Sequence, residues 1–179
     1  HSGERYNASE YSTIDTALCL NGIITATNYF QDEEIQQLAS LVFERVDWGH
    51  FVFEKDGKLL FRMAFNPDRH GAYVSSQPGF ISQWDMAAEQ KMMYMQAAGS
   101  LAADTARSLY HGFSRDTGAY DGQTMIINPG GTLFAYQYSE AWFDFASYLD
   151  PDGIDWFNNT RLAALANRDF CIQQSSNSR

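Results

Sequence analysis

The sequence predicts a mainly all-α chain built from helical hairpins, with one short β-hairpin near residues 51–65. Two observations predict this fold class. Apolar residues recur at three- and four-residue steps in about six segments, and this is the period of an amphipathic helix. In addition, Asp56-Gly57 lies between two runs rich in Phe, Val and Leu, and such a dipeptide is a good signal for a β-hairpin turn.

The first two helices are predicted to form a hairpin. The first begins at Ser12, because Ser12 and Asp15 have the spacing of a capping box, and its apolar pattern continues to Thr27. The second spans residues 32–46, and its acidic first turn suits the positive end of a helix dipole. The short link Phe30-Gln31 then joins the two helices.

Four more helices are predicted after the β-hairpin. They are expected at residues 82–98, 102–113, 134–148 and 156–173 from their apolar periodicity. Residues 66–79 read as a loop because they are rich in Pro, Gly and Ser, and residues 116–132 as an irregular stretch with a short strand at 124–127. Residues 175–179 are expected to form a disordered tail.

Composition narrows the classes of function. The chain of 179 residues is 45% hydrophobic and 15% aromatic, which is typical of a globular protein with many rings available for packing or binding. Its net charge of −10 disfavours phosphate backbones, so we expect no nucleic-acid partner. No apolar run approaches the roughly 20 residues that cross a bilayer. The cysteines and histidines lack metal-ligand spacing, so no metal or cofactor is expected.

Two segments place carboxylates beside aromatic residues at predicted helix ends. Glu10 and Asp15 flank Tyr11 in the first, and Glu89 follows Trp84 in the second. Hydrolysis of a glycosidic bond needs two separated carboxyl groups, one to protonate the leaving oxygen and one to activate water or attack the sugar. Aromatic rings bind the apolar faces of sugars, so the pattern favours a carbohydrate-active enzyme.

Five ordered segments also carry a family resemblance. They are Glu10–Leu18, Arg45–Trp48, Trp84–Ser100, Leu133–Asp144 and Asn159–Ala163. The chain resembles the bacterial glucoamylase-like (glycoamylase) family, which contains β-1,2-glucanases and the transglycosylase domain of cyclic β-1,2-glucan synthases. This resemblance implies a glucan oligosaccharide or polysaccharide as the partner, and a periplasmic or secreted location.

The family fold is an (α/α)6 barrel, and about 12 helices of ordinary length need more chain than is present here. We therefore expect about half of an (α/α)6 toroid. Residues 1–179 would be a single segment, the central part of a longer barrel catalytic domain. The remaining segments of that barrel would be its partners, and the segment alone would be inactive.

The resemblance also implies roles for particular residues. Glu89 would be the catalytic proton donor, with Asp15 or Glu10 as its acidic partner, although the local pattern alone is more typical of an exposed helix carboxylate at Glu89 and of a capped first turn at Asp15. Seven residues would bind substrate: Trp84, Tyr136, Gln137, Tyr138, Trp142, Asp144 and Arg62. The chain departs from the family pattern at Ala135, Tyr136 and Glu140, where relatives often have Gly, His and a neutral or basic residue.

The resulting hypothesis is a glycoside hydrolase that acts on a β-glucan, with β-1,2-glucan first among the candidates. Two alternatives stay open: the transglycosylase portion of a cyclic β-1,2-glucan synthase, and a non-catalytic glucan-binding protein. The stereochemical outcome is also open. Carboxyl groups about 6.5–9.5 Å apart would indicate inversion, and a separation of about 5–5.5 Å would indicate retention.

Overall fold

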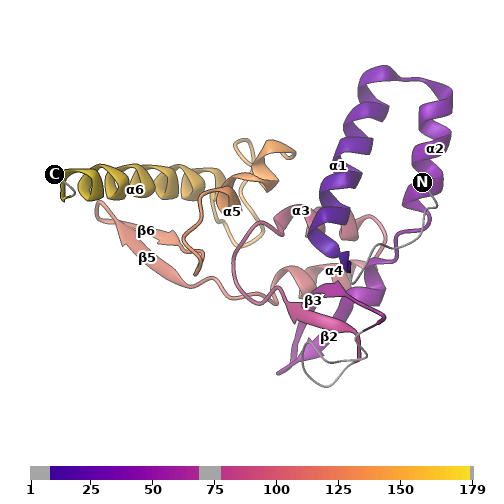
Figure 1. Ribbon diagram of the computed structural model, residues 1–179, viewed down its shortest axis with the longest axis horizontal. Coiled ribbons are helices and arrows are strands. Elements are labelled where there is room, and N and C mark those ends of the chain that lie inside the picture. Colours follow the sequence, from indigo (N-terminus) through magenta and orange to yellow (C-terminus); the bar gives the residue numbers. More distant parts are fainter. Residues whose placement is uncertain (1–8, 69–77, 178–179) are drawn as a thin grey trace. The chain divides into compact units, whose positions relative to one another are not determined.

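The computed structural model describes residues 9–68 and 78–177 of the chain (Figure 1). Over these residues it contains six α-helices, two 3-10 helices and two antiparallel sheets, one with four strands and one with two. This mixed α/β fold contradicts the prediction of a mainly all-α chain that forms about half of an (α/α)6 toroid. The prediction was wrong because several segments expected to be helical or irregular are extended, and they satisfy their backbone groups by pairing between strands.

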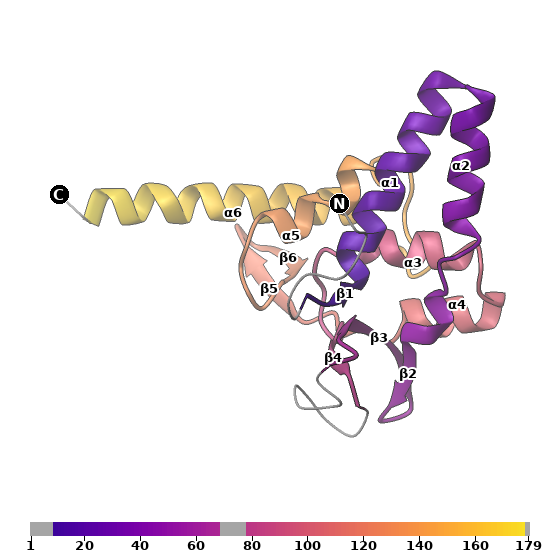
Figure 2. The same ribbon diagram turned by 45° about the vertical axis from the view of Figure 1, so that its right-hand side comes forward.

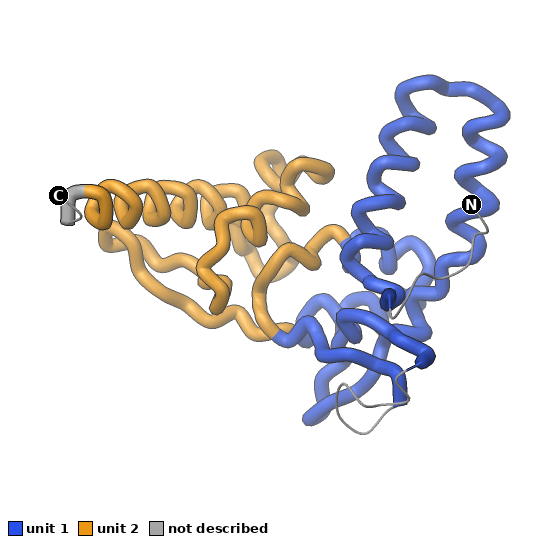
Figure 3. Tube along the Cα trace, in the orientation of Figure 1, with its two compact units in different colours: residues 1–85, 93–112 blue, residues 86–92, 113–179 orange. Residues whose placement is uncertain are grey.

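The chain divides into two compact units, which Figure 3 distinguishes by colour. The first unit comprises residues 1–85 and 93–112, and the second comprises residues 86–92 and 113–179. Each unit contains one of the two sheets.

The predicted β-hairpin is part of the larger sheet, in the first unit, and its second strand is the central one. Strand β2 (Val52–Lys55) pairs antiparallel with strand β3 (Lys58–Phe65). The turn residues Asp56 and Gly57 both have positive φ, at 53° and 74°. Positive φ at both central positions is what a type I′ turn requires, and Asp-Gly is among the dipeptides that adopt it most readily.

Two further strands complete this sheet by pairing with the second half of β3. Strand β1 (Tyr11–Ser12) pairs through Tyr11 with Phe65, and strand β4 (Phe80–Gln83) pairs through Phe80 with the same residue. β4 overlaps the start of the helix that we predicted at 82–98, so that boundary was wrong. Pairing with β3 satisfies the backbone groups of this stretch, and local helical periodicity carries no information about such a partner.

The helical hairpin at the beginning of the chain is confirmed, and Figures 1 and 2 both show its two helices side by side. Helix α1 (Thr13–Phe30) is capped by Ser12, whose hydroxyl accepts a hydrogen bond from the Asp15 amide at 3.2 Å. Helix α2 (Glu33–Phe43) is capped by the Asp32 carboxylate, which accepts from two amides of the first turn. Both caps satisfy amide groups that have no partner inside their helix.

Three short helices pack in the first unit around β3. They are the 3-10 helix η1 (Trp48–Phe51), the part of α3 (Lys91–Ala98) that follows Met92, and α4 (Ala103–Tyr110). Phe61 of β3 is fully buried, and its ring lies 5.5 Å from that of Tyr94. Gly112 follows α4, and a Cβ at this position would lie 1.8 Å from the Leu59 carbonyl oxygen, so only glycine allows this approach to β3.

The second unit combines a two-stranded sheet with a long helix. Strands β5 (Thr117–Tyr120) and β6 (Gln123–Ile126) form an antiparallel hairpin where we expected one short strand, and α6 (Trp156–Asn177) follows later in the chain. Its core contains Met125, Leu162 and Ala163. Helix α6 continues through Asn177, into the segment 175–179 for which we expected a disordered tail. Residues 178–179 lie outside the described part.

The helix predicted at 134–148 is much shorter. The chain forms only α5 (Phe134–Gln137) and the 3-10 helix η2 (Ser139–Ala141). After η2 it is irregular, and the Asp144 carboxylate accepts a hydrogen bond from the Ser147 amide at 3.2 Å. Local side-chain bonds of this kind compete with the helical backbone bonds, which is why Asp and Ser favour turns.

Candidate functional site

Glu89 lies in a turn immediately before α3. Our prediction that it lies inside a helix was therefore wrong. The residue is half-buried, and its backbone carbonyl accepts a hydrogen bond from the Ser139 hydroxyl at 2.7 Å. The same hydroxyl accepts from the Met92 amide at 2.9 Å. Ser139 is fully buried, so these two bonds hold the turn that carries Glu89 against η2 within the second unit.

A buried ion pair lies close to Glu89 in the sequence. The Lys91 ammonium is 3.1 Å from a carboxylate oxygen of Glu140, and their side chains are only 5% and 8% exposed. The same Glu140 oxygen accepts a hydrogen bond from the Thr160 hydroxyl at 2.6 Å. Burial lowers the pKa of Lys91, whereas the charge of Glu140 and its hydrogen bond act to raise it.

Aromatic rings complete the surroundings of this cation. Lys91 Nζ lies 4.6 Å from the ring centre of Trp156 and 5.1 Å from that of Phe145. Both distances are within the range of a cation–π interaction. The acidic residue at position 140, which departs from the family pattern, thus has a buried basic partner. Our sequence analysis missed Lys91, and the Glu140 departure was the signal that could have prompted a search for a compensating charge.

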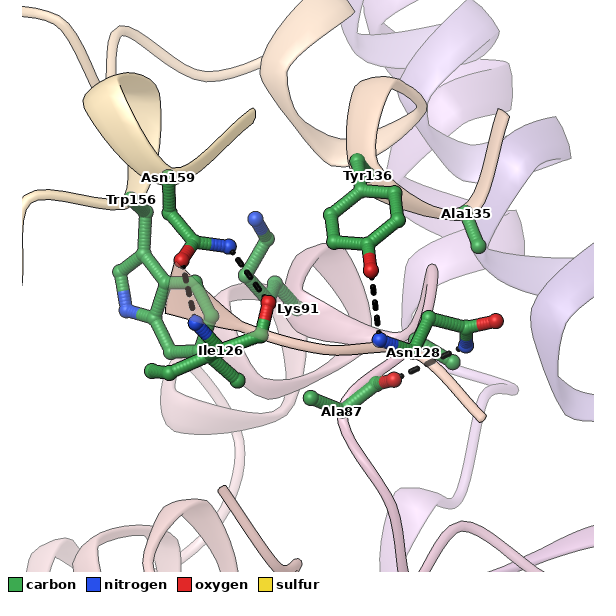
Figure 4. Close-up of a pocket in the computed structure, with 9 residues that line it drawn as sticks. Ala87, Lys91, Ile126, Asn128, Ala135, Tyr136, Trp156 and Asn159 are labelled. Atoms are coloured by element: carbon green, nitrogen blue, oxygen red, sulfur yellow. Dashed lines mark hydrogen bonds between the residues drawn. The ribbon is translucent and has the colours of Figure 1, made fainter. Parts of the chain in front are cut away.

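A small cavity next to Lys91 is shown in Figure 4. It is lined by Ala87, Ala88, Lys91, Ile126, Asn128, Ala135, Tyr136, Trp156 and Asn159. Its volume of about 10 Å³ has room for about one water molecule and is too small for a sugar ring. The Tyr136 hydroxyl accepts a hydrogen bond from the Asn128 amide at 2.6 Å, and Asn159 bonds both backbone groups of Ile126.

Four other residues that we expected to bind substrate lie at the surface of the second unit. Gln137 is exposed, and the aromatic side chains of Tyr138 and Trp142 are 41% and 40% exposed. Asp144 is also exposed. These side chains follow one another along α5, η2 and the stretch after η2, and both rings offer apolar surface that solvent reaches.

The remaining expected site residues belong to the first unit. Glu10 and Asp15 are exposed, one just before β1 and the other in the first turn of α1. Trp84 is buried, and its indole N–H donates to the Thr13 hydroxyl at 3.1 Å. Arg62 is also buried, with its guanidinium 3.5 Å from the ring centre of Phe53. Trp84 and Arg62 are therefore part of the interior of this unit, whereas both carboxylates face solvent.

The first unit also contains an open cleft of about 380 Å³, which our sequence analysis did not predict. Its lining comprises Tyr11, Thr13, Thr16, Arg45, Val46, Asp47, Trp48, His50, Phe51 and Phe65. The segment Arg45–Trp48 was already noted for its resemblance, and its alternation of charged and apolar residues was the signal that could have indicated a binding surface.

Metal-binding clusters and membrane-spanning helices are both absent from the described residues. Residues 9–68 and 78–177 contain no group of three or more His, Cys, Asp or Glu side chains placed to hold a metal ion. No helix within this part of the chain is long and apolar enough to span a membrane.

Comparison with known proteins indicates the class of glycoside hydrolases. Residues 81–178 match the Glycoamylase family model, described as "Putative glucoamylase". The match covers more than half of the chain, so the protein belongs to this glucoamylase family. Membership implies a carbohydrate substrate. No curated protein and no solved structure matches the chain.

Proposed function

We propose that this protein is a glycoside hydrolase that cleaves a β-glucan, with β-1,2-glucan as the first substrate to test. The observation that carries the proposal is the family match over residues 81–178, because it includes the segment from Trp84 to Glu89. The surface rings of Tyr138 and Trp142 lie within the same match and give sugar faces a place to stack.

Glu89 is our candidate for the proton donor. A general acid must present its carboxyl group to the leaving oxygen in a fixed position, and the two hydrogen bonds of Ser139 restrain the backbone on which Glu89 sits. Partial burial of the residue restricts its side chain further. A restrained backbone and a partly buried side chain are expected of a general acid that must be oriented. A carboxylate that is merely solvated at the surface needs neither.

Asp15 and Glu10 are the candidates for the second carboxylate. Both are exposed and therefore accessible to water and to a sugar chain. In an inverting reaction the second carboxylate removes a proton from the attacking water while the general acid protonates the departing sugar oxygen. In a retaining reaction it forms a glycosyl–enzyme ester, which water then hydrolyses. No cofactor takes part in either route.

The test is product analysis with the full-length gene product that contains this sequence. Wild-type protein and the variants Glu89→Gln, Asp15→Asn and Glu10→Gln would be incubated with linear β-1,2-, β-1,3- and β-1,4-glucans. We expect reducing oligosaccharides from one linkage, and a loss of about 10²–10⁴-fold in kcat for Glu89→Gln, since general acid catalysis contributes this much. The exposed Glu44 provides the matched control, Glu44→Gln, which should keep full activity.

Three other results would contradict part of this proposal. Cyclic products would indicate the transglycosylase reaction of a cyclic glucan synthase, in which a sugar hydroxyl replaces water as the acceptor. Binding of a glucan without any turnover would indicate a glucan-binding protein. Unchanged turnover by Glu89→Gln would remove Glu89 from the mechanism.

A further inference from the structure

The open cleft of the first unit has the size of a ligand site. Its volume of about 380 Å³ falls within the range of roughly 300–1,000 Å³ that is typical of small-molecule pockets. None of its lining residues has a role in the proposed function. The lining comes from four places in the chain: β1, the start of α1, the segment from the end of α2 to η1, and the end of β3.

Aromatic side chains form a fixed wall of this cleft. The ring centre of His50 lies 5.3 Å from that of Phe51 and 5.8 Å from that of Phe65, and both contacts are edge-to-face. This is a favourable geometry for aromatic pairs, so each ring restrains the next. Trp48 is only 5% exposed and anchors η1 in the interior of the unit.

Tyr11 differs from these rings because it is 55% exposed. Its backbone is held by the pairing of β1 with β3, opposite Phe65. A large ring that is half in solvent, on a backbone fixed by a sheet, offers an apolar face to a ligand at little entropic cost.

Two charged side chains of opposite sign add hydrogen-bonding groups to the cleft. Arg45 and Asp47 are both exposed, and one oxygen of Asp47 accepts from the His50 amide at 3.2 Å as the cap of η1. That bond orients the carboxylate and leaves its second oxygen able to accept from a ligand hydroxyl. The two charges cancel, so this lining does not select for an ionic ligand, although the whole chain carries a net charge of −10.

We propose that this cleft is a sugar-binding subsite, in which a glucose unit stacks on Tyr11 and its hydroxyls bond to Arg45 and Asp47. A pyranose ring is neutral, has apolar faces and carries hydroxyls around its edge, which matches the three properties of the cleft. The proposal rests on the proposed function for its choice of a glucan as the ligand. It assigns substrate contacts to residues of the first unit that the proposed chemistry does not use.

The test measures binding separately from turnover. Short β-1,2-linked glucose oligomers would be titrated by calorimetry into the full-length gene product carrying Glu89→Gln, so that hydrolysis during the titration is slow. Tyr11→Ala and Arg45→Ala should each raise Kd by about tenfold, the effect of losing one stacking contact or one charged hydrogen bond. Tyr11→Phe should keep the wild-type Kd because the ring remains.

Matched controls come from the same unit. Tyr29 is 80% exposed and Arg107 is exposed on α4, and neither lines the cleft. Tyr29→Ala and Arg107→Ala should leave Kd unchanged, and all of these variants should unfold at the wild-type temperature. A rise in Kd that is the same for cleft and control variants, or no binding of any oligomer, would overturn the proposal.

The two proposals fail in different ways. If the wild-type protein does not hydrolyse any glucan but Kd still depends on Tyr11 and Arg45, the proposed function fails and the subsite stands. If hydrolysis depends on Glu89 but Kd is unaffected by both cleft variants, the subsite fails and the proposed function stands.

Discussion

The buried hydroxyl of Ser139 donates to the carbonyl of Glu89 at 2.7 Å, although the two residues are 50 positions apart in the chain. It also accepts from the Met92 amide at 2.9 Å, so a single side chain ties both sides of the turn that precedes α3. If Glu89 is the proton donor, Ser139 is a positioning residue, because it acts on the backbone of the acid and not on the substrate.

Ser139→Ala should therefore lower kcat on natural glucan by about tenfold or more, with KM nearly unchanged, because a displaced acid protonates the leaving oxygen less well. On an aryl β-glucoside whose leaving group needs no protonation, the loss should be much smaller. Steady-state kinetics on both substrates checks this. Ser175, exposed on α6, supplies the control Ser175→Ala. Equal losses on both substrates would point instead to general damage of the fold.

Lys91 and Glu140 should be strongly coupled in stability. Removing one partner leaves an unpaired buried charge, so Lys91→Met or Glu140→Met alone should lower the free energy of unfolding by about 3–5 kcal/mol. The double variant Lys91→Met/Glu140→Met should be closer to wild type, because no buried charge remains. Urea unfolding of the four proteins measures the coupling. If the losses in free energy of unfolding of the two single variants add up to that of the double variant, the two side chains do not stabilise each other.

The Asn159 side chain, on α6, bonds to the backbone of β6 in the way that a neighbouring strand would. Its side-chain oxygen accepts from the Ile126 amide at 2.6 Å and its amide donates to the Ile126 carbonyl at 3.0 Å, and the residue is buried (Figure 4). Asn159→Ala should cost about 2–4 kcal/mol, since both backbone groups of Ile126 lose a partner. The neighbouring Asn158 bonds only at the surface, so Asn158→Ala should cost under about 1 kcal/mol in the same unfolding assay.

The contact between Tyr120 and Asp169 should respond to pH. The Tyr120 hydroxyl donates to the Asp169 carboxylate at 2.5 Å, and this bond, with a further one from Arg168, lowers the pKa of Asp169. A carboxyl group with a lowered pKa contributes stability above its ordinary pKa, and that contribution is lost as pH falls through the lowered value.

The Tyr120→Phe variant tests this contact directly. It should raise the pKa of Asp169 toward the ordinary value for an aspartate and weaken the loss of stability in acid. A carboxyl-detected NMR titration of the two proteins measures the pKa. An unchanged Asp169 pKa in the variant would contradict the prediction.

Local features were determined by the sequence alone. The cap formed by Ser12 and Asp15, the helix that begins after Asp32, and the turn at Asp56-Gly57 each depend on residues within three positions of one another. Their free energy comes from hydrogen bonds and φ preferences inside that short span, so spacing and residue type are sufficient to predict them. The family resemblance agreed with the match for the three segments within residues 81–178, whereas Glu10–Leu18 and Arg45–Trp48 lie outside it.

The sheets and the surroundings of the candidate acid were decided by tertiary structure. β4 is a strand because β3 pairs with it, and Glu89 is held by a hydroxyl 50 residues away. Glu140 is tolerated in a buried position because Lys91 neutralises it. Such pairings gain their free energy only when distant segments meet, and because periodicity depends only on neighbouring residues, it could not identify which segments pair.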